Sequence, residues 1–522
     1  MSSTAPIRQL ARGGVLNVSG SVIGGGAGIA LVVLVTNGVR QDIAGLLFAA
    51  TSFFLIVTAV SALGTDVGLA HAVQRRLVAG SPASALVTVG IALRAVVALS
   101  VAVAVIVWIA APWFAAVIGQ DADRAAMTGM LRVLALALPV ATAYDTVLAA
   151  TLAYGTTRAN VLVEKLGRMP GQILCVLGAL LFGVGPTGLA IAWAAPYLLG
   201  LVAVAWWCRR IAHGRAPALP SPTAGHVQGE EPKKAALARE FWAFTAPRAL
   251  GRICQVALQR TDIVLVAALL SPRHAAIYTA ATRFLVVGQV GMQAIQQVLA
   301  PQLSKLFARG DIRGVRQVFS TSTAWLMAIT WPVYLTSAVA APLLLQIFGP
   351  GYESGLATVV ILSLTMLATT ATGSVDVVLL MAGRSRQSLV NNASALVIDV
   401  ALVVLLVPPL GITGAAFAWA AALAARNVLP MIQVRRAFGV TSLGPAVGWV
   451  AASSGLCFGG VPVLLSLVLP MTWWVLAAWL TGMGVAYTAL LWRGRAQLEL
   501  AAFSALPRLP LRVRAAAGRL TG

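Results

Sequence analysis

The sequence predicts an all-α polytopic membrane protein with fourteen transmembrane helices. Hydrophobic residues make up 59% of the chain and charged residues 10%, with a mean hydropathy of +0.89, whereas soluble domains contain about 25% charged residues. Apolar runs of roughly 20 residues, the length that crosses a bilayer, recur along the whole chain. The loops between these runs alternate between basic and nearly uncharged, which is typical of membrane topology.

The predicted spans end at turn-forming stretches such as residues 183–186 and Pro408-Pro409. The fourteen spans are predicted near residues 14–36, 43–70, 84–111, 128–153, 160–182, 186–208, 241–270, 275–300, 318–346, 355–381, 388–407, 411–434, 446–469 and 471–492.

One set of alternate loops carries the arginines, including Arg75-Arg76, Arg384/Arg386 and Arg435-Arg436. Because Lys and Arg are enriched on the cytoplasmic side of membrane proteins, both termini are predicted to be cytoplasmic. The chain has 37 basic and 15 acidic residues, but the basic residues form no contiguous soluble domain. Nucleic acid is therefore not an expected partner.

Residues 209–239 are rich in Pro, Gly, Ser and charge, which is the composition of a flexible linker. The basic segment after the last span is expected to lie against membrane lipids. The predicted organisation is an N-lobe of six spans (1–208), a cytoplasmic linker (209–239), a C-lobe of six spans (240–437), two further spans (438–492) and a basic cytoplasmic tail (493–522).

An internal repeat relates the two predicted lobes. GPTGLAIAWAA at 185–195 matches GITGAAFAWAA at 411–421 at an offset of 226 residues, and 47–51 parallels 277–282 at an offset near 231. Both segments are Ala-rich, so convergence is an alternative, although the Gly, Thr and Trp positions also agree. Six spans separate equivalent points, so the lobes are predicted to share one orientation and to be related by an axis along the membrane normal.

A polar stripe marks the seventh span. On a continuous helix over 241–270, five polar residues fall within about 40° of one line. Charged groups inside a membrane normally face protein or water, so the stripe predicts the wall of a substrate cavity. The alternative is that the arginines snorkel to the cytoplasmic surface while the aspartate pairs with a neighbouring helix. The five residues are Arg248, Arg252, Gln255, Gln259 and Asp262.

Other ionisable residues are predicted inside spans. Arg94 and Arg283 are candidates for the same cavity, because guanidinium groups match phosphate oxygens. Asp145, Asp262, Asp376 and Asp399 are candidates for carrying a coupling proton or Na⁺, with structural Asp–Arg pairing as the alternative. Asp66, Glu164, Lys165 and Arg168 lie near span ends, where a role at the cytoplasmic interface is an equally good interpretation.

The sequence predicts a protein that is not an enzyme. None of the four lysines follows a glycine, so there is no phosphate-binding loop of the ATPase kind. Asp121-Ala122-Asp123 resembles a glycosyl-transfer motif but lies in a short outer loop. The four cysteines lie singly, without metal-ligand spacing. No cofactor and no metal are expected.

The chain resembles the Wzx-type polysaccharide flippases of the multidrug/oligosaccharidyl-lipid/polysaccharide (MOP) exporter superfamily. The resemblance covers about residues 12–440. It is carried by Gly45, residues 63–70 (LGTDVGLA) running into Arg75-Arg76, residues 276–281, 301–306 with Gly310-Asp311, 349–352, Asn391-Asn392 and 407–416.

The resemblance implies alternating access between two six-span lobes and transfer of a polyprenyl-pyrophosphate-linked oligosaccharide from the cytoplasmic to the outer leaflet of the bacterial inner membrane. A coupling proton or Na⁺ and a complex with a polysaccharide polymerase are further partners to test. Lipid II flippase and multidrug or cation antiporter of the same superfamily are the alternative functions. The family pattern does not assign cavity residues, so those named above rest on the helical-face argument.

Overall fold

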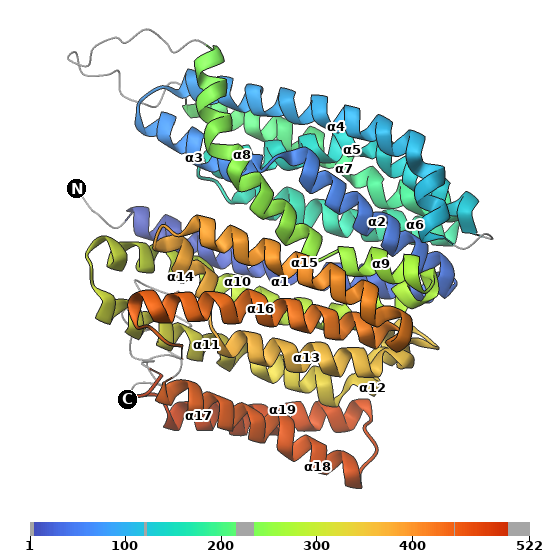
Figure 1. Ribbon diagram of the computed structural model, residues 1–522, viewed down its shortest axis with the longest axis vertical. Coiled ribbons are helices and arrows are strands. Elements are labelled where there is room, and N and C mark those ends of the chain that lie inside the picture. Colours follow the sequence, from blue (N-terminus) through green and yellow to red (C-terminus); the bar gives the residue numbers. More distant parts are fainter. Residues whose placement is uncertain (1–4, 120–122, 216–233, 443, 499–522) are drawn as a thin grey trace. The chain divides into compact units, whose positions relative to one another are not determined.

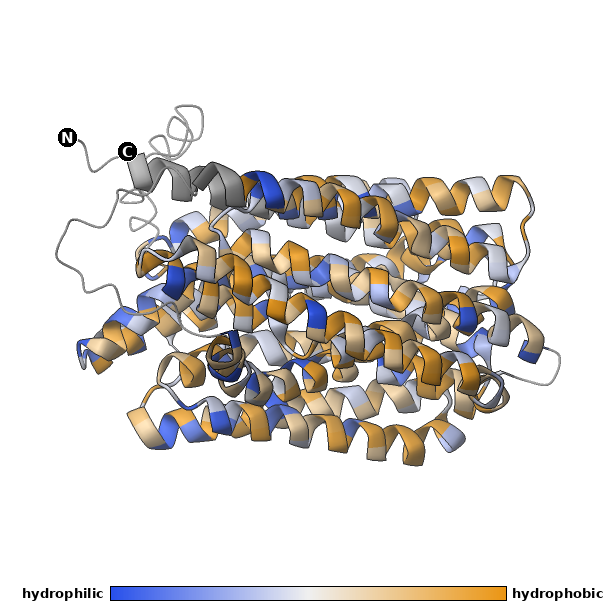
Figure 2. Ribbon diagram, turned by 90° about the horizontal axis from the view of Figure 1, so that it is seen from above, coloured by the Kyte–Doolittle hydropathy of each residue, from blue (hydrophilic) through white to orange (hydrophobic). Residues whose placement is uncertain are grey.

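A computed structural model describes residues 5–119, 123–215, 234–442 and 444–498 of the protein. Every regular element in these ranges is a helix, and they contain no strand (Figure 1). Apolar residues run along the helices and are interrupted at separate positions by hydrophilic ones (Figure 2). Most of the predicted linker (216–233) and of the predicted tail (499–522) lies outside the described residues.

The chain divides by its contacts into two compact units. One consists of Gly26–Ala276, and the other of Met1–Gly25 with Ile277–Gly522; they are called here the 26–276 unit and the 277–522 unit. Helices α8 and α9 follow the predicted linker in sequence and pack with α2, α3 and α4 in the 26–276 unit. The predicted lobes, 1–208 and 240–437, are defined by the sequence repeat and not by contacts, so their boundaries stay a prediction.

The 26–276 unit begins within α1 (Ala5–Gly38) and holds a nine-residue π-helix, η2 (Asn160–Arg168). Its other helices are α2 (Gln41–Ala62), α3 (Thr65–Val78), α4 (Pro82–Ile118), α5 (Arg124–Ala153), α6 (Met169–Leu181), α7 (Pro186–Arg215), α8 (Lys234–Leu258) and α9 (Thr261–Leu269).

The 277–522 unit contains the helices from α10 onwards, together with the first part of α1. Its helices are α10 (Pro272–Ala308, whose first turn is in the other unit), α11 (Ile312–Val339), α12 (Ala341–Leu345), η3 (Gln346–Phe348), η4 (Tyr352–Gly355), α13 (Leu356–Ala371), α14 (Val375–Met381), α15 (Ser385–Leu410), α16 (Ile412–Phe438), α17 (Pro445–Ser454), η5 (Gly455–Gly460), α18 (Val461–Val468) and α19 (Trp473–Arg493).

The helices confirm a polytopic membrane protein. Within the described ranges, ten are long and apolar enough to cross a membrane, or eleven if Ile312–Val339 and Ala341–Phe348, bent by 79°, form one span. Three predicted spans, at 160–182, 241–270 and 275–300, are helical but are not among these ten or eleven. They carry most of the ionisable and amide residues discussed above, which lowers their hydropathy. The count of fourteen stays a prediction.

Helix starts follow the sequence repeat. Helix α7 begins at Pro186 and α16 at Ile412, which are 226 residues apart. Helix α2 begins at Gln41 and α10 at Pro272, which are 231 residues apart. These are the two offsets of the internal sequence match, so the matched segments begin equivalent helices in the two halves of the chain.

Helices α2 and α3 are parts of one long apolar segment broken at Leu63-Gly64. Both residues have positive φ, 50° and 69°, a conformation that strains a branched side chain but suits glycine. Gly64 is needed for a second reason: a Cβ there would lie 2.8 Å from the Cα of Ala249 on α8. The break therefore brings the start of α3 directly against α8.

Helices α3 and α8 run antiparallel along a seam of small residues. Gly64 meets Ala249, and one turn further along α3, Gly68 meets Thr245, where an added Cβ would lie 2.2 Å from the threonine hydroxyl oxygen. Small residues at four-residue spacing allow two helix backbones to approach closely inside a membrane. This close approach brings the polar side chains of the two helices within reach of each other.

Replacement of Gly68 by alanine should destabilise the seam. The new Cβ overlaps the fully buried Thr245, and overpacking of this kind costs about 1–3 kcal/mol. The apparent melting temperature of the purified protein in detergent should fall for Gly68→Ala and recover in Gly68→Ala/Thr245→Ala, which removes the overlapping atoms. The matched control is Gly90→Ala on α4, where an added Cβ meets nothing within 4 Å. Equal melting temperatures for both single variants would contradict the close approach.

Candidate functional site

Arg248 begins the predicted stripe on α8, and its side chain is exposed. Its guanidinium carbon lies 3.7 Å from the centre of the Phe244 ring, and it donates a hydrogen bond to the Phe244 carbonyl oxygen at 2.8 Å. The ring of His71 on α3 stacks on the same phenylalanine, 3.9 Å between centres and 13° between planes. A guanidinium has five N–H donors, so this contact orients Arg248 and leaves it able to bind an anion.

Arg252, one turn further along α8, is paired across the seam. Its Nε lies 3.4 Å from a carboxylate oxygen of Asp66 at the start of α3, and both side chains are 47% exposed. Its terminal nitrogen donates to the side-chain oxygen of Gln255 at 3.2 Å. The structure therefore brings together two predicted site residues, Arg252 and Gln255, with Asp66, which the sequence places equally well at the interface.

Two charged contacts mark two depths along the seam. Near the end of α3, Glu240 of α8 accepts hydrogen bonds from Arg75 at 2.6 Å and Arg76 at 2.8 Å. With a rise of about 1.5 Å per residue, the pair formed by Asp66 and Arg252 lies roughly 14–18 Å further along the helices. The apolar core of a bilayer is about 30 Å thick, so this pair lies about half a membrane away from Arg75 and Arg76.

The continuous helix predicted over 241–270 is wrong. Helix α8 ends at Leu258 and α9 begins at Thr261, because the N–H groups of Gln259 and Arg260 bond three residues back instead of four. Gln259 is exposed in this turn, whereas Asp262 is 3% exposed in the first turn of α9. The periodicity that placed Gln259 and Asp262 on the arginine stripe does not continue through the break.

Asp145 lies on α5 in the same unit, and its side chain is exposed. Its carboxylate interacts electrostatically with Arg252 and Asp66 from the seam, and with Glu164 and Arg168. Asp145 is thus one of the predicted ion-coupling residues in the 26–276 unit, and its carboxylate is close enough to the arginine stripe to interact with Arg252. A carboxylate in this position can exchange a proton and thereby change the charge that Arg252 experiences.

Sequence reasoning missed a buried charged cluster on η2. Glu164 accepts a hydrogen bond from Arg168 at 2.6 Å and another from the Tyr144 hydroxyl at 2.7 Å. The Arg168 and Glu164 side chains are 9% and 15% exposed, and the Arg168 guanidinium lies 4.5 Å from the centre of the Tyr197 ring. These partners come from α5 and α7, and π-helical turns often occur at functional sites. The spacing of Glu164 and Arg168 is a signal that the sequence offers.

Two predicted site residues belong to helices other than α3 and α8. Arg94 lies exposed on α4. Arg283 belongs to the 277–522 unit, where its Nε donates to the Thr279 carbonyl oxygen at 3.2 Å. The participation of Arg94 and Arg283 in one cavity with Arg252 stays a prediction.

Asp376 and Asp399 lie in the 277–522 unit on α14 and α15. Asp376 accepts a hydrogen bond from the Ser388 hydroxyl at 2.5 Å, and Asp399 is fully buried. The Asn391 and Gln433 amides exchange hydrogen bonds at 2.9 and 3.0 Å between α15 and α16. Over the described ranges, no group of three or more His, Cys, Asp and Glu side chains is arranged to hold a metal.

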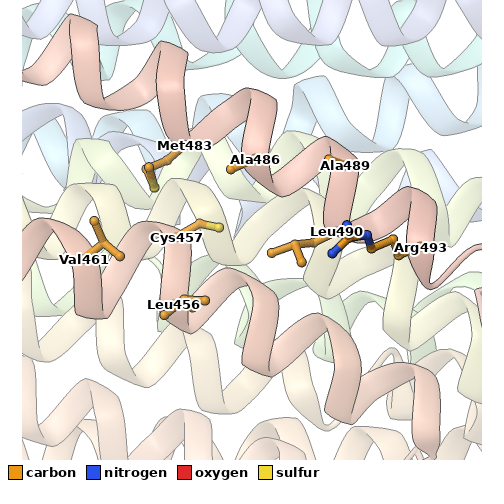
Figure 3. A pocket seen from close by; sticks show the side chains of 8 residues that line it. All are labelled: Leu456, Cys457, Val461, Met483, Ala486, Ala489, Leu490 and Arg493. Atoms are coloured by element: carbon orange, nitrogen blue, oxygen red, sulfur yellow. The ribbon is translucent and has the colours of Figure 1, made fainter.

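A cavity of about 360 Å³ lies in the 277–522 unit between η5, α18 and α19. Its lining side chains include Leu456, Val461, Met483 and Leu490, with the guanidinium of Arg493 at one end (Figure 3). An apolar surface of this kind suits a hydrocarbon chain and offers nothing to a sugar.

Comparison with known proteins gives one family and a group of related folds. The model of a family described as "Polysaccharide biosynthesis protein" matches residues 47–354. A search of curated protein sequences gave no match. Among solved structures, the lipid II flippase MurJ in an inward closed conformation is similar with a TM-score of 0.70 at 10% sequence identity, over 93% of this chain and 98% of that chain.

Two further solved structures have a similar fold. An inward-facing multidrug resistance transporter of the MATE family of the MOP superfamily has a TM-score of 0.63 at 13% identity, over 79% of this chain and 94% of that one. A MOP superfamily transporter from Pyrococcus furiosus has a TM-score of 0.56 at 15% identity, over 83% of this chain and 96% of that one. Its structure is described by a binding pocket of reverse polarity, which suggests a different function for that protein. Identities this low establish the fold alone.

Replacement of Glu164 by glutamine should strongly destabilise the 26–276 unit. The change leaves Arg168 buried without its carboxylate, and breaking one side of a buried ion pair costs about 3–5 kcal/mol. The melting temperature should fall far more than in Asp42→Asn, which breaks the exposed pair between Arg40 and Asp42 and is expected to change stability by about 0–1 kcal/mol. Similar shifts in the two variants would show that Glu164 and Arg168 are solvated.

Proposed function

The chain belongs to the polysaccharide biosynthesis protein family and has the fold of MOP-type flippases and transporters, and we propose that it moves a polyprenyl-pyrophosphate-linked oligosaccharide from the cytoplasmic to the outer leaflet. The proposed mechanism is alternating access, as in Wzx-type flippases. The cargo is the lipid-linked repeat unit of a cell-surface polysaccharide, and membrane lipids surround the protein throughout.

The pair formed by Arg252 and Asp66 is the observation that carries this proposal. Arg252 has one exposed guanidinium at mid-membrane depth, and Arg248 adds a second one turn away. A guanidinium binds phosphate oxygens through forked donors. A pyrophosphate passing this point can replace Asp66 as the partner of Arg252, because both present oxygen anions to the same donors. Arg94 and Arg283 are proposed as further contacts.

Ion coupling is proposed to act through Asp145. Protonation of this carboxylate removes a negative charge that Arg252 experiences, so the attraction of Arg252 for an anionic cargo rises. Release of the proton has the opposite effect. Asp262, Asp376 and Asp399 remain the other candidates for carrying a proton or Na⁺.

The fold does not select among the functions found in the superfamily. Lipid II flippases and multidrug transporters share it, as the solved structures illustrate. The family match favours polysaccharide synthesis. Growth of a deletion strain without loss of viability would argue against lipid II transport, and unchanged drug sensitivity would argue against an antiporter.

The proposed location is the bacterial inner membrane, with both termini in the cytoplasm. This orientation rests on the positive-inside bias of the loops, which include Arg75-Arg76 and Arg435-Arg436. A complex with a polysaccharide polymerase would place polymerisation next to the outer side of the flippase.

Replacement of Arg252 by alanine should abolish export of the surface glycan while the membrane level of the protein stays unchanged. The substitution removes the guanidinium that is proposed to hold the pyrophosphate, and Arg248→Ala should have the same direction of effect. Surface glycan and protein level are measured in a complemented deletion strain. The control is Arg309→Ala, an exposed arginine just after α10, which should export normally. Normal export in both Arg252→Ala and Arg248→Ala would refute the cavity assignment.

A further inference from the structure

A second basic site lies between the last turns of α3 and the first turns of α8. A cavity of about 250 Å³ is lined there by His71, Arg75, Arg76, Glu240 and Phe244, among others. It is distinct from the site of Arg252, which lies roughly 14–18 Å further along the two helices. The loop charge bias predicts that this end of α3 is cytoplasmic, so the cavity would face the leaflet from which a cargo is loaded.

The charges of this cavity are unbalanced. One carboxylate, Glu240, uses both of its oxygens to bind Arg75 at 2.6 Å and Arg76 at 2.8 Å. Two guanidinium groups thus share one acidic side chain among the described residues that line the cavity, and an anion of higher charge than a carboxylate would satisfy them better.

The Arg76 guanidinium is held by Glu240 through one terminal nitrogen, while its Nε has no acceptor among the described residues. Its side chain is 15% exposed, and its Nε is buried and makes no hydrogen bond to any residue that the structure describes. A buried donor without an acceptor is destabilising. A phosphate group has more acceptor oxygens than a carboxylate and can bind Nε and a terminal nitrogen of one guanidinium together.

We infer that this cavity is a docking site for the pyrophosphate head group of the lipid carrier, and that Glu240 occupies it in the structure as an internal substitute for that anion. An incoming pyrophosphate displaces the Glu240 carboxylate and takes over Arg75 and Arg76. The inference rests on the proposed function, since it adds a loading site on the cytoplasmic side to the mid-membrane site at Arg252.

A simpler interpretation is that Glu240 only fastens the start of α8 to α3. The two interpretations predict opposite effects of Glu240→Gln on anion binding. If Glu240 competes with the ligand, its neutralisation should tighten binding about tenfold, because it frees Arg75 and Arg76 from two exposed ion pairs. If Glu240 only stabilises the contact between α8 and α3, the affinity of the variant for the anion should stay the same or fall.

The test measures binding of inorganic pyrophosphate and of geranyl pyrophosphate to the purified full-length protein in phosphatidylcholine nanodiscs by isothermal titration. The expected result is about tenfold tighter binding of both probes to Glu240→Gln than to the wild type. The matched control is Asp42→Asn, which removes the same charge from another exposed ion pair of this unit and should leave affinity unchanged. Equal affinities for Glu240→Gln and Asp42→Asn would overturn the site.

Substitution of the two arginines is the second test of the docking site. In an Arg252→Ala background, which removes the mid-membrane site, Arg75→Gln/Arg76→Gln should lose the remaining pyrophosphate binding, and retention of binding would overturn the site. If the double variant does not fold, Arg76→Lys serves instead, because it keeps the charge but loses the fork; its affinity should fall, and unchanged affinity would again overturn the proposal.

Two further outcomes identify the source of the ligand. Binding of inorganic pyrophosphate without geranyl pyrophosphate would mean a soluble anion and would overturn the lipid-carrier assignment. Equal competition by phosphatidylglycerol would mean a general phospholipid site and would also overturn it. Because binding is measured on purified protein, these results are independent of glycan export, so a failure of the docking site and a failure of the proposed function can be told apart.

Discussion

The close antiparallel contact between α3 and α8 is the constraint on which the rest of the candidate site depends. Gly64 and Gly68 let the two backbones approach, and every polar contact along the seam follows from that approach. Glu240 reaches Arg75 and Arg76, His71 reaches Phe244, and Asp66 reaches Arg252. Wider separation of the helices would remove all three contacts together, so the seam acts as one unit.

The positions of the helices could be predicted from sequence, because hydropathy and turn residues are local signals. The starts of α7 and α16 agree with the internal repeat to the residue. Two local departures from ideal geometry could not be predicted. The break after Leu258 follows from a switch to three-residue hydrogen bonding, and η2 is a π-helix. Periodicity arguments assume 3.6 residues per turn, so they fail where the helix itself changes.

The site could be predicted only in part, for a different reason. Arg252 was visible as a charge inside an apolar run, but its partner Asp66 is far away in sequence. Arg75 and Arg76 were informative as markers of topology, whereas their contact with Glu240 spans 165 and 164 residues. Glu164 and Arg168 lie near the end of a predicted span, so the sequence leaves open whether they face the cytoplasmic interface or the protein interior. Their burial depends on Tyr144 and Tyr197 from other helices, which no local pattern reveals.

Helix α8 joins parts of the polypeptide that the sequence separates. It follows residues 216–233, yet it packs into the unit built from the chain before them. A cut within 216–233 would therefore give two incomplete fragments. The first would lack α8, which packs on α3, and the second would expose the face of α8 that carries Thr245 and Ala249. Reassociation of such fragments would be driven by the same glycine-mediated fit, so a nick at this point is tolerable for the folded protein.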